Sequence, residues 1–264
     1  METSKKELNK SVKFISDSAA KIAESIMKVF KGKSEVVELI LTTLFAKGHV
    51  LLEDVPGTGK TVLAKSLAKS IDSTFSRIQC TPDLMPADVT GSSIFYPKTQ
   101  EFQFRSGPIM SSMVLVDELN RATPRTQSAL LEAMAEGQVS VDGNTYKLPE
   151  PFFLIATENP VESEGTFPLP EAQKDRFMMS LSIGYPDLEN EAMIIESQRS
   201  IHHPIETIKP CITCEEILTC QNDIVDVHVD RGVLDYILQL VNTTRNDSLI
   251  KVGVSPRGAI ALYK

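Results

Sequence analysis

Apolar residues recur every three or four positions over the first part of the chain, which is the spacing of an amphipathic helix. Residues 1 to about 31 show this spacing at Val12, Ile15, Ala19, Ile22, Ile26 and Val29. A second run of the same kind begins at Ser34, a residue suited to a helix N-cap, and Gly48 is expected to close it. The chain is therefore predicted to begin with two amphipathic helices.

Further along, short continuous apolar runs alternate with helical patterns. The predicted strands cover residues 49–52, 75–80, 113–116 and 152–157, and the predicted helices between them cover residues 60–70 and 124–136. Near-continuous apolar strands separated by helices indicate a parallel sheet that is covered on both faces. The predicted fold is α/β, with a three-layer αβα core over residues 1–185 that includes the N-terminal helix.

The pattern changes after Asp187, where no further strand-like apolar run is found. Helical patterns cover residues 188–200, 214–223 and 231–244, and Pro204 and Pro210 interrupt the chain between the first two. Another helix is expected to start near Pro256, and Lys264 ends the chain inside it. These features predict a small helical lid domain over residues 186–264, which we expect to be truncated.

Composition is ordinary for a soluble globular protein, with 42% hydrophobic and 23% charged residues. No run approaches the roughly 18 to 20 apolar residues of a membrane span, and the polar amino terminus lacks the apolar segment of a signal peptide. Four cysteines in a chain of 264 residues do not form a disulfide framework. A cytoplasmic protein is therefore expected.

Charge and cysteine spacing disfavour two further classes of site. Lys and Arg number 27 against 35 Asp and Glu, so the formal net charge is −8, and no run of five like charges supplies a basic face for nucleic acid. Cys211 and Cys214 have the C-x-x-C spacing of a metal site. No second pair lies at a matching distance, and His202, His203 and His228 complete no zinc pattern. Neither nucleic acid nor zinc is expected as a ligand.

The segment Pro56-Gly57-Thr58-Gly59-Lys60-Thr61 lies between a predicted strand and a predicted helix. It matches the end of the phosphate-loop pattern G-x-x-x-x-G-K-[ST], although Asp54 stands at the first glycine position. The glycines allow backbone N–H groups to face an anion at a helix N-terminus. Lys60 is predicted to reach the β- and γ-phosphates and Thr61 to hold Mg²⁺. A glycine-rich turn that only caps a helix is the alternative, but such a turn would not require Lys-Thr.

Polar side chains follow two of the predicted strands. Asp117 and Glu118 come directly after residues 113–116. An acidic helix start would also account for the pair, but downstream of a phosphate loop they suit Mg²⁺ binding through water and activation of the attacking water, respectively. Asn159 follows the strand over 152–157 and is predicted to face the γ-phosphate, whereas a simple turn before Pro160 is the alternative.

Together these residues resemble the MoxR family of AAA+ ATPases, in the branch that carries an insert in its second core helix. The resemblance extends over nearly the whole chain from about Val29. It rests on the strings LLEDVPGTGKT, TPDLMPADVTG, FRSGPI, VDELNRATPRTQSALLEAM, ATENPVESEGTFPLPEAQKDRF and, near the end, GVSPRGA. Asp54 in place of glycine is usual in this family.

The resemblance implies ATP hydrolysis, with ATP and Mg²⁺ as cofactors. Its catalytic positions match Lys60, Glu118 and Asn159 (sensor 1), together with Arg176 as an arginine finger that contacts the γ-phosphate in a neighbouring subunit and Arg257 as sensor 2. An arginine suits both the arginine-finger and the sensor 2 roles, because it is always charged and can contact two phosphate oxygens at once. Without the resemblance, a surface ion pair would be the preferred interpretation of Arg176.

The remaining site positions follow from the same match. Mg²⁺ is assigned to Thr61 and Asp117. The nucleotide is assigned to Val55, Pro56, Gly57, Thr58, Gly59, Lys60, Thr61 and Val62 in the loop, and to Gly32 and Lys33 beside the base. The family usually has Gln at the position of Lys33, so this sequence departs from the pattern there.

Two predicted hairpins indicate a task beyond hydrolysis. Residues 90–108 look like the insert hairpin of this branch, and residues 137–150 form a second one, with Asp142-Gly143-Asn144 at its turn. Such hairpins face the pore in related ring ATPases, although passive surface hairpins are the alternative. The resemblance implies a hexameric ring with a chaperone-like task on a protein client, and a von Willebrand factor A domain protein as a partner. The rival functions are a nucleic-acid-stimulated motor and a nucleotide-dependent scaffold with little turnover.

Overall fold

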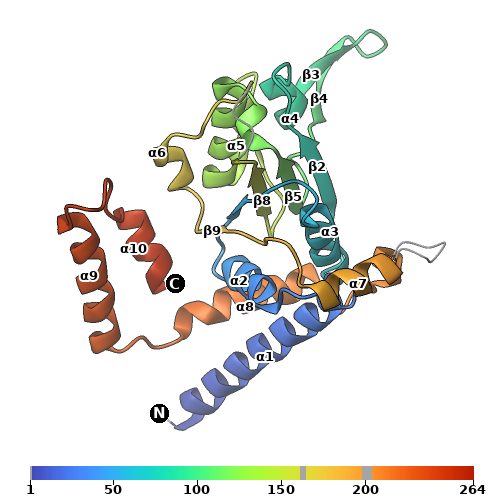
Figure 1. Ribbon diagram of the computed structural model, residues 1–264. Helices are drawn as coiled ribbons and strands as arrows, with labels where there is room; N and C mark the ends of the chain where they lie inside the picture. The colour runs from blue at the N-terminus through green and yellow to red at the C-terminus, as the bar shows by residue number, and fades with distance from the viewer. Residues whose placement is uncertain (1, 161–164, 198–203) are drawn as a thin grey trace.

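The computed structural model describes residues 2–160, 165–197 and 204–264 (Figure 1). At its centre lies a five-stranded sheet in which every pairing is parallel. The strands, in spatial order, are β2 (Phe75–Gln79), β5 (Met113–Asp117), β8 (Phe153–Glu158), β1 (Val50–Glu53) and β9 (Met179–Leu181). The parallel sheet expected from the apolar runs is confirmed. The strand β9 has only three residues, lies at the edge of the sheet, and has no fully buried residue. Its sequence therefore lacks the apolar run of a core strand, and the sequence pattern did not predict it.

Side chains alternate between two hydrophobic clusters along the strands, so both faces of the sheet are covered. In β1, Val50 and Leu52 belong to one cluster and Leu51 to the other. The first cluster includes residues of α1 (Glu2–Met27), α2 (Ser34–Phe45), α3 (Lys60–Ser70) and α8 (Cys214–Asp223). The second includes residues of α4 (Pro86–Thr90), η1 (Leu119–Arg121) and α5 (Pro124–Glu136). The predicted three-layer αβα core is confirmed.

The ends of α2 differ from the prediction. Lys33 occupies the N-cap position and Ser34 is already helical, and no side chain caps this helix end. At the other end Lys47, and not Gly48, takes the left-handed conformation, with φ of 56°. Gly48 is needed for space instead, since a Cβ there would lie 2.6 Å from the Met178 side chain. The glycine therefore permits close packing of the chain against the strand edge.

Two hairpins extend the second face. The antiparallel strands β3 (Gly91–Tyr96) and β4 (Glu101–Ser106) form the expected insert hairpin, which projects from the core in Figure 1. The second hairpin pairs β6 (Gln138–Val141) with β7 (Asn144–Lys147). Its turn is the dipeptide Asp142-Gly143, both at positive φ as a type I′ turn requires. Asn144 was predicted in the turn, but it pairs with Val141 as the first residue of β7.

The carboxyl-terminal part is helical, as predicted, although residues 198–200 of the first predicted helix lie outside the described residues. Its elements are α7 (Leu188–Ser197), η2 (Pro204–Thr207), α8, η3 (Ile224–Asp226), α9 (Arg231–Asn246) and α10 (Pro256–Tyr263), preceded by the short α6 (Glu171–Lys174). Ile217 and Cys220 of α8 are buried in the first cluster, whereas α9 and α10 lie side by side away from the sheet (Figure 1). No helix of the described ranges is long and apolar enough to cross a membrane.

Candidate functional site: a phosphate loop at the carboxyl edge of the sheet

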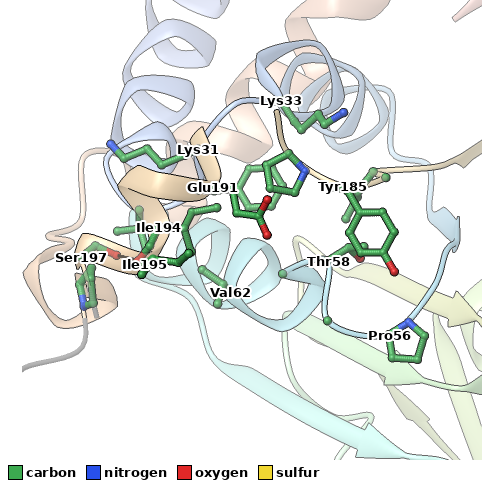
Figure 2. A pocket seen from close by; sticks show the side chains of 18 residues that line it. Lys31, Lys33, Pro56, Thr58, Val62, Tyr185, Glu191, Ile194, Ile195 and Ser197 are labelled. Carbon is green, nitrogen blue, oxygen red and sulfur yellow. Dashed lines mark hydrogen bonds between the residues drawn. The ribbon is translucent and has the colours of Figure 1, made fainter. Parts of the chain in front are cut away.

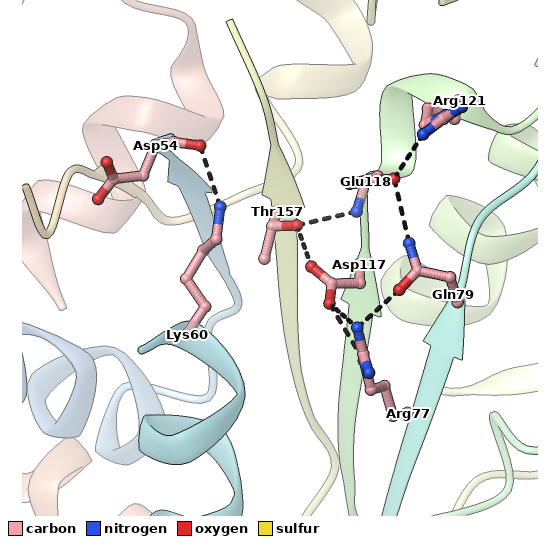
Figure 3. A network of polar contacts seen from close by, with 8 residues as sticks. All are labelled: Asp54, Lys60, Arg77, Gln79, Asp117, Glu118, Arg121 and Thr157. Atoms are coloured by element: carbon pink, nitrogen blue, oxygen red, sulfur yellow. Dashed lines mark hydrogen bonds and ion pairs between the residues drawn. The ribbon is translucent and has the colours of Figure 1, made fainter. Parts of the chain in front are cut away.

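The phosphate loop connects β1 to α3 at the edge of the sheet where the parallel strands end. Gly57 and Gly59 both have left-handed backbones, with φ of 85° and 88°, and Gly59 is the N-cap of α3. A helix N-terminus presents unpaired N–H groups and a partial positive charge, which suits a phosphate group. Lys60 Nζ donates to the backbone carbonyl of Asp54 at 3.0 Å, so the ammonium folds back over the loop (Figure 3).

Asp54, at the position of the missing glycine, is a buried anchor for this loop. Its carboxylate accepts hydrogen bonds from the backbone N–H of Val55 (2.8 Å), Ile183 (2.8 Å) and Gly184 (2.7 Å). Ile183 and Gly184 belong to the segment that leads from β9 towards α7. Asp54 therefore ties the start of the phosphate loop to that segment, a role that the sequence pattern does not reveal.

A cavity of about 330 Å³ opens beside the loop, and Figure 2 shows its lining. It falls within the roughly 300–1,000 Å³ range of small-molecule pockets. Of the two residues assigned to the nucleotide base, Lys33 lines the cavity, whereas Gly32 lies outside its lining, where its φ of 83° and a close approach to Asn190 require glycine. The walls are mostly apolar and include Phe30, Val62, Ile183, Tyr185, Ile194 and Ile195. An apolar slot next to a phosphate loop fits a nucleotide base.

The acidic pair lies at the end of β5 in a closed polar network (Figure 3). Asp117 is 9% exposed; its Oδ1 accepts from the Thr157 hydroxyl at 2.7 Å, and its Oδ2 accepts from Arg77 Nη2 at 2.6 Å. Glu118 has φ of 56°, and its Oε2 accepts from Gln79 at 3.1 Å. This network brings the two predicted carboxylates together.

Three neighbours of this pair were not predicted as site residues: Arg77 and Gln79, which lie in none of the family strings, and Thr157, which lies in the string that contains Asn159. Arg77 Nη2 also donates to Gln79 Oε1 at 2.7 Å, so side chains of β2 link Asp117 to Glu118. Thr157 Oγ1 accepts from the Glu118 backbone N–H at 2.8 Å. Their alternate positions on β2 and β8, the strands on either side of β5, are the one signal that could have found them.

The donor set at this edge fits Mg²⁺. A hard cation prefers oxygen ligands and is usually held by one or two carboxylates with water. The buried Asp117 carboxylate, with Thr61 at the start of α3, supplies that chemistry. Within the part of the chain that the structure describes, no group of three or more His, Cys, Asp and Glu side chains could hold a metal ion by itself. A cation here would therefore share its ligands with phosphate oxygens and water.

Asn159 follows β8 and is 4% exposed, and its carbonyl accepts from Asn120 Nδ2 at 3.4 Å. The residue before it, Glu158, stands in register with Glu53 of β1. Lys174 Nζ lies 2.7 Å from Glu53 Oε1 and 3.2 Å from Glu158 Oε2, and it bridges the two carboxylates. The predicted sensor residue thus adjoins a charged cluster at the same edge of the sheet.

The two predicted arginines lie together, in a different place. Arg176 follows α6 and donates to the carbonyl of Leu131 at 3.0 Å. Arg257, at the start of α10, lies 3.8 Å from Asp175, which also accepts from the Ser255 hydroxyl at 2.7 Å. Both arginines line one cleft of about 300 Å³, and no residue of the phosphate loop lines it. The structure therefore brings Arg176 and Arg257 together but does not bring them to the loop of their own chain.

A P-loop nucleotide-binding core with a phosphate loop, a paired carboxylate site and a helical extension defines an AAA+ ATPase. The family model described as "ATPase family associated with various cellular activities (AAA)" matches residues 49–179. The chain is 53% identical over 244 residues to the uncharacterized protein YeaC of Bacillus subtilis, with 92% of this chain and 76% of that protein covered.

Two further relatives narrow the class. The chain is 39% identical over 246 residues to chaperone MoxR1 of Mycobacterium tuberculosis, with 90% of this chain and 64% of that protein covered. The crystal structure of an inferred ATPase from Cytophaga hutchinsonii superposes with a TM-score of 0.89 at 37% identity, with 100% of this chain and 82% of that chain covered. The chain belongs to the MoxR family of AAA+ ATPases, and it is an ATPase.

Proposed function

We propose that this ATPase uses Mg²⁺-dependent hydrolysis of ATP to remodel a protein client, and that it works in a ring assembly. The observation that carries the proposal is a division of the site. The phosphate loop, the acidic pair and the apolar cavity converge at one edge of the sheet, whereas Arg176 and Arg257 line a separate cleft. In this proposal a second subunit brings the arginines to the nucleotide.

In this proposal the base enters the cavity beside Tyr185, and the phosphates lie over the loop at the N-terminus of α3. Lys60 exchanges its contact with the Asp54 carbonyl for the β- and γ-phosphates. Thr61 and Asp117 hold Mg²⁺, which when bound would neutralise charge on the phosphate oxygens. Lys33 lines the cavity in place of the usual glutamine and contributes to the contacts with the nucleotide.

Glu118 acts as the base that orients the attacking water and accepts its proton. Its carboxylate accepts from Gln79 at 3.1 Å and from Arg121 at 3.2 Å, so it is held in place by donors on two sides. Asn159 orients the same water at the γ-phosphate. Arg176 and Arg257 of one subunit reach the γ-phosphate bound to the next, and their charge stabilises the transition state there.

The task and the assembly are supported by relationship and charge. A relative at 39% identity is named a chaperone, and hexameric rings are implied by the resemblance to this family. The insert hairpin and the second hairpin lie on one face, where they can contact a client. A von Willebrand factor A domain protein is the proposed partner. The net charge of −8 weighs against a motor on nucleic acid.

The glutamate variant Glu118→Gln tests the hydrolytic role. It should keep ATP binding within about threefold of the parent and lower turnover by roughly 100-fold or more, since general-base catalysis contributes about 10²–10⁴. Glu38→Gln, on the exposed face of α2, is the matched control and should leave both unchanged. Unchanged turnover in Glu118→Gln would show that another group is the base.

Mixed assemblies test the arrangement between subunits. Arg176→Ala alone should be inactive, and mixing it with Glu118→Gln should restore turnover at interfaces that combine an intact Glu118 with an intact Arg176. Failure to restore turnover at any ratio would exclude action between subunits. Strong stimulation of the parent ATPase by DNA would instead favour a nucleic-acid motor.

A further inference from the structure

The charged cluster of Glu53, Glu158 and Lys174 joins three elements of the fold. Glu53 and Glu158 are the last residues of β1 and β8, and their in-register pairing places both side chains on the same face of the sheet. Lys174 is the last residue of α6. Its ammonium lies 2.7 Å from Glu53 and 3.2 Å from Glu158, and the Ser180 hydroxyl donates to Glu53 at 3.1 Å. One cation therefore bridges two neighbouring carboxylates.

Electrostatics make Lys174 necessary to this cluster. Burial raises the pKa of Glu158, and the nearby Lys174 charge opposes that shift. The hydrogen bond from Lys174 lowers the pKa of Glu53. Burial alone would lower the pKa of Lys174, but its contacts with the two carboxylates outweigh burial and raise it. Without the ammonium, two adjacent carboxylates would repel each other, and the more buried one would take up a proton.

Each residue of the cluster adjoins a residue of the proposed catalytic machinery. Glu53 immediately precedes Asp54, the anchor of the phosphate loop, and Glu158 immediately precedes Asn159. Lys174 stands two residues before Arg176, whose backbone N–H donates to the Gln173 carbonyl at 3.2 Å in the turn that ends α6. The cluster therefore lies between the nucleotide site of this chain and Arg176, which is proposed to act in the neighbouring subunit.

The arginine loop is also held by Asp175, which accepts from the Ser255 hydroxyl at 2.7 Å, and by the hydrogen bond from Arg176 to the Leu131 carbonyl at 3.0 Å. Helix α6 has four residues and none is buried. Beyond Arg176 the chain is fixed by Phe177, which is buried in the second cluster, and by the hydrogen bond from the Met178 N–H to the His49 carbonyl at 2.9 Å. Before Arg176, Leu169 is buried in the second cluster just ahead of α6, and the bridge through Lys174 ties the helix itself to the ends of β1 and β8.

We propose that Lys174 is a positioning residue that ties the Arg176 loop to the ends of β1 and β8. Through this tie, the nucleotide site of one subunit fixes the position of the Arg176 side chain that acts in the neighbouring subunit. This inference rests on the proposed action of Arg176 between subunits. It differs from a salt bridge that only adds stability, because its loss should be felt at the neighbouring site and not at the subunit's own site.

Lys174→Met is the variant that tests it, since methionine keeps the length of the side chain without the charge. Nucleotide affinity should stay within about threefold of the parent, and turnover should fall at least about tenfold. Lys13→Met, on the exposed side of α1, is the matched control and should leave turnover unchanged. Parent-like turnover in Lys174→Met would overturn the proposal.

Mixing with Glu118→Gln locates the defect. Lys174→Met retains its own Glu118, so a Glu118→Gln neighbour that supplies a well-placed Arg176 should restore turnover. Rescue of Arg176→Ala without rescue of Lys174→Met would assign Lys174 to its own site and overturn the coupling. Rescue of neither would overturn the action of Arg176 between subunits, on which this inference rests.

A pH profile and a second variant guard against a general folding defect. In Lys174→Met, turnover relative to the parent should rise as the pH is lowered, because burial raises the pKa of Glu158 and a proton on it relieves the repulsion from Glu53. Lys174→Met combined with Glu158→Gln should lose this pH dependence and should be rescued by Glu118→Gln in the same way. A pH-independent defect in the single variant, or a double variant that folds but is not rescued, would refute the positioning role.

Discussion

The carboxylate of Asp54 accepts a hydrogen bond from the backbone N–H of Gly184 at 2.7 Å. This contact links the first residue of the phosphate loop to a segment 130 positions further along the chain. It also explains why the loop can dispense with the glycine of the general pattern. A glycine there would supply only backbone freedom, whereas the carboxylate pairs three N–H groups at the mouth of the nucleotide cavity.

Asp54→Gly is predicted to weaken the protein although it restores the general motif. Hydrogen bonds to a charged group are worth about 1.5–3 kcal/mol each, and the buried N–H of Ile183 would lose its acceptor. The free energy of unfolding should fall by about 3 kcal/mol, and the Kd for ATP should rise. Denaturant unfolding and nucleotide titration measure the two effects. Asp54→Asn keeps one acceptor oxygen, so its free energy of unfolding should lie between those of the parent and of Asp54→Gly. An Asp54→Gly variant as stable as the parent would contradict the anchoring role.

Arg77→Met is predicted to make Asp117 more available to Mg²⁺. The guanidinium contacts Asp117 Oδ2 through Nε at 3.1 Å and Nη2 at 2.6 Å, so the cation competes with it for the same oxygen (Figure 3). The Mg²⁺ concentration for half-maximal turnover should decrease several-fold, while maximal turnover falls because Gln79 loses its partner. Titration of turnover with Mg²⁺ measures both. Arg125→Met, exposed on α5, should change neither, and a higher Mg²⁺ requirement in Arg77→Met would contradict competition.

Much of this fold could be predicted because its signals are local. The strands of the core are short apolar runs, α3 and α5 carry helical spacing, and the loop between β1 and α3 has a characteristic order of glycines, Lys60 and Thr61. The carboxyl edge of a parallel sheet then gathers Asp117, Glu118 and Asn159 without further information. These elements lie where the sequence pattern places them.

What could not be predicted depends on which strands become neighbours. Arg77 and Gln79 contact the acidic pair only because β2 lies next to β5. Lys174 contacts Glu53 and Glu158 only because α6 lies at the ends of β1 and β8. The alternate spacing of Arg77 and Gln79 places both side chains on one face of β2, but it does not say which strand lies beside them, and nothing in the sequence around Lys174 indicates its contacts. The prediction for the end of α2 also missed a contact between distant residues. Lys47 takes the left-handed conformation there, and Gly48, whose N–H donates to the Thr43 carbonyl at 2.9 Å, is required to be glycine by the close approach of the Met178 side chain.

His49 is predicted to make stability depend on pH. It lies partly buried immediately before β1; its Nδ1 accepts from the Leu154 N–H at 3.1 Å, so its Nε2 carries the proton and donates to the Met134 carbonyl at 3.2 Å. Burial lowers the pKa of His49 from 6.5 to about 4. The unfolded chain therefore binds a proton that the folded chain resists, and stability present above pH 6.5 is lost as the pH falls towards 4.

Between pH 8 and pH 5 this residue should lower the free energy of unfolding by about 2 kcal/mol, which denaturant unfolding at the two pH values measures. His49→Gln should be less stable at pH 8 but should lose less on acidification than the parent does. His228→Gln, at an exposed position, should show the parent's pH dependence. An equal loss in His49→Gln and the parent would rule out this assignment.

The rings of Phe104 and Tyr146 stack with centroids 3.8 Å apart and planes inclined by 14°, and they join the insert hairpin to the second hairpin. The second hairpin follows α5, which itself follows the acidic pair, so the stack connects the insert to the nucleotide site. An aromatic pair contributes about 0.5–1.5 kcal/mol, so Tyr146→Ala should raise hydrogen exchange in β3 and β4 roughly 2- to 10-fold. Tyr146→Phe keeps the ring and should exchange like the parent, and Phe102→Ala, at the exposed tip, should not loosen β6 and β7. If the amide hydrogens of β3 and β4 exchange at the same rate in Tyr146→Ala and Tyr146→Phe, the ring stack does not couple the two hairpins. A movement of one hairpin would then not be transmitted to the other.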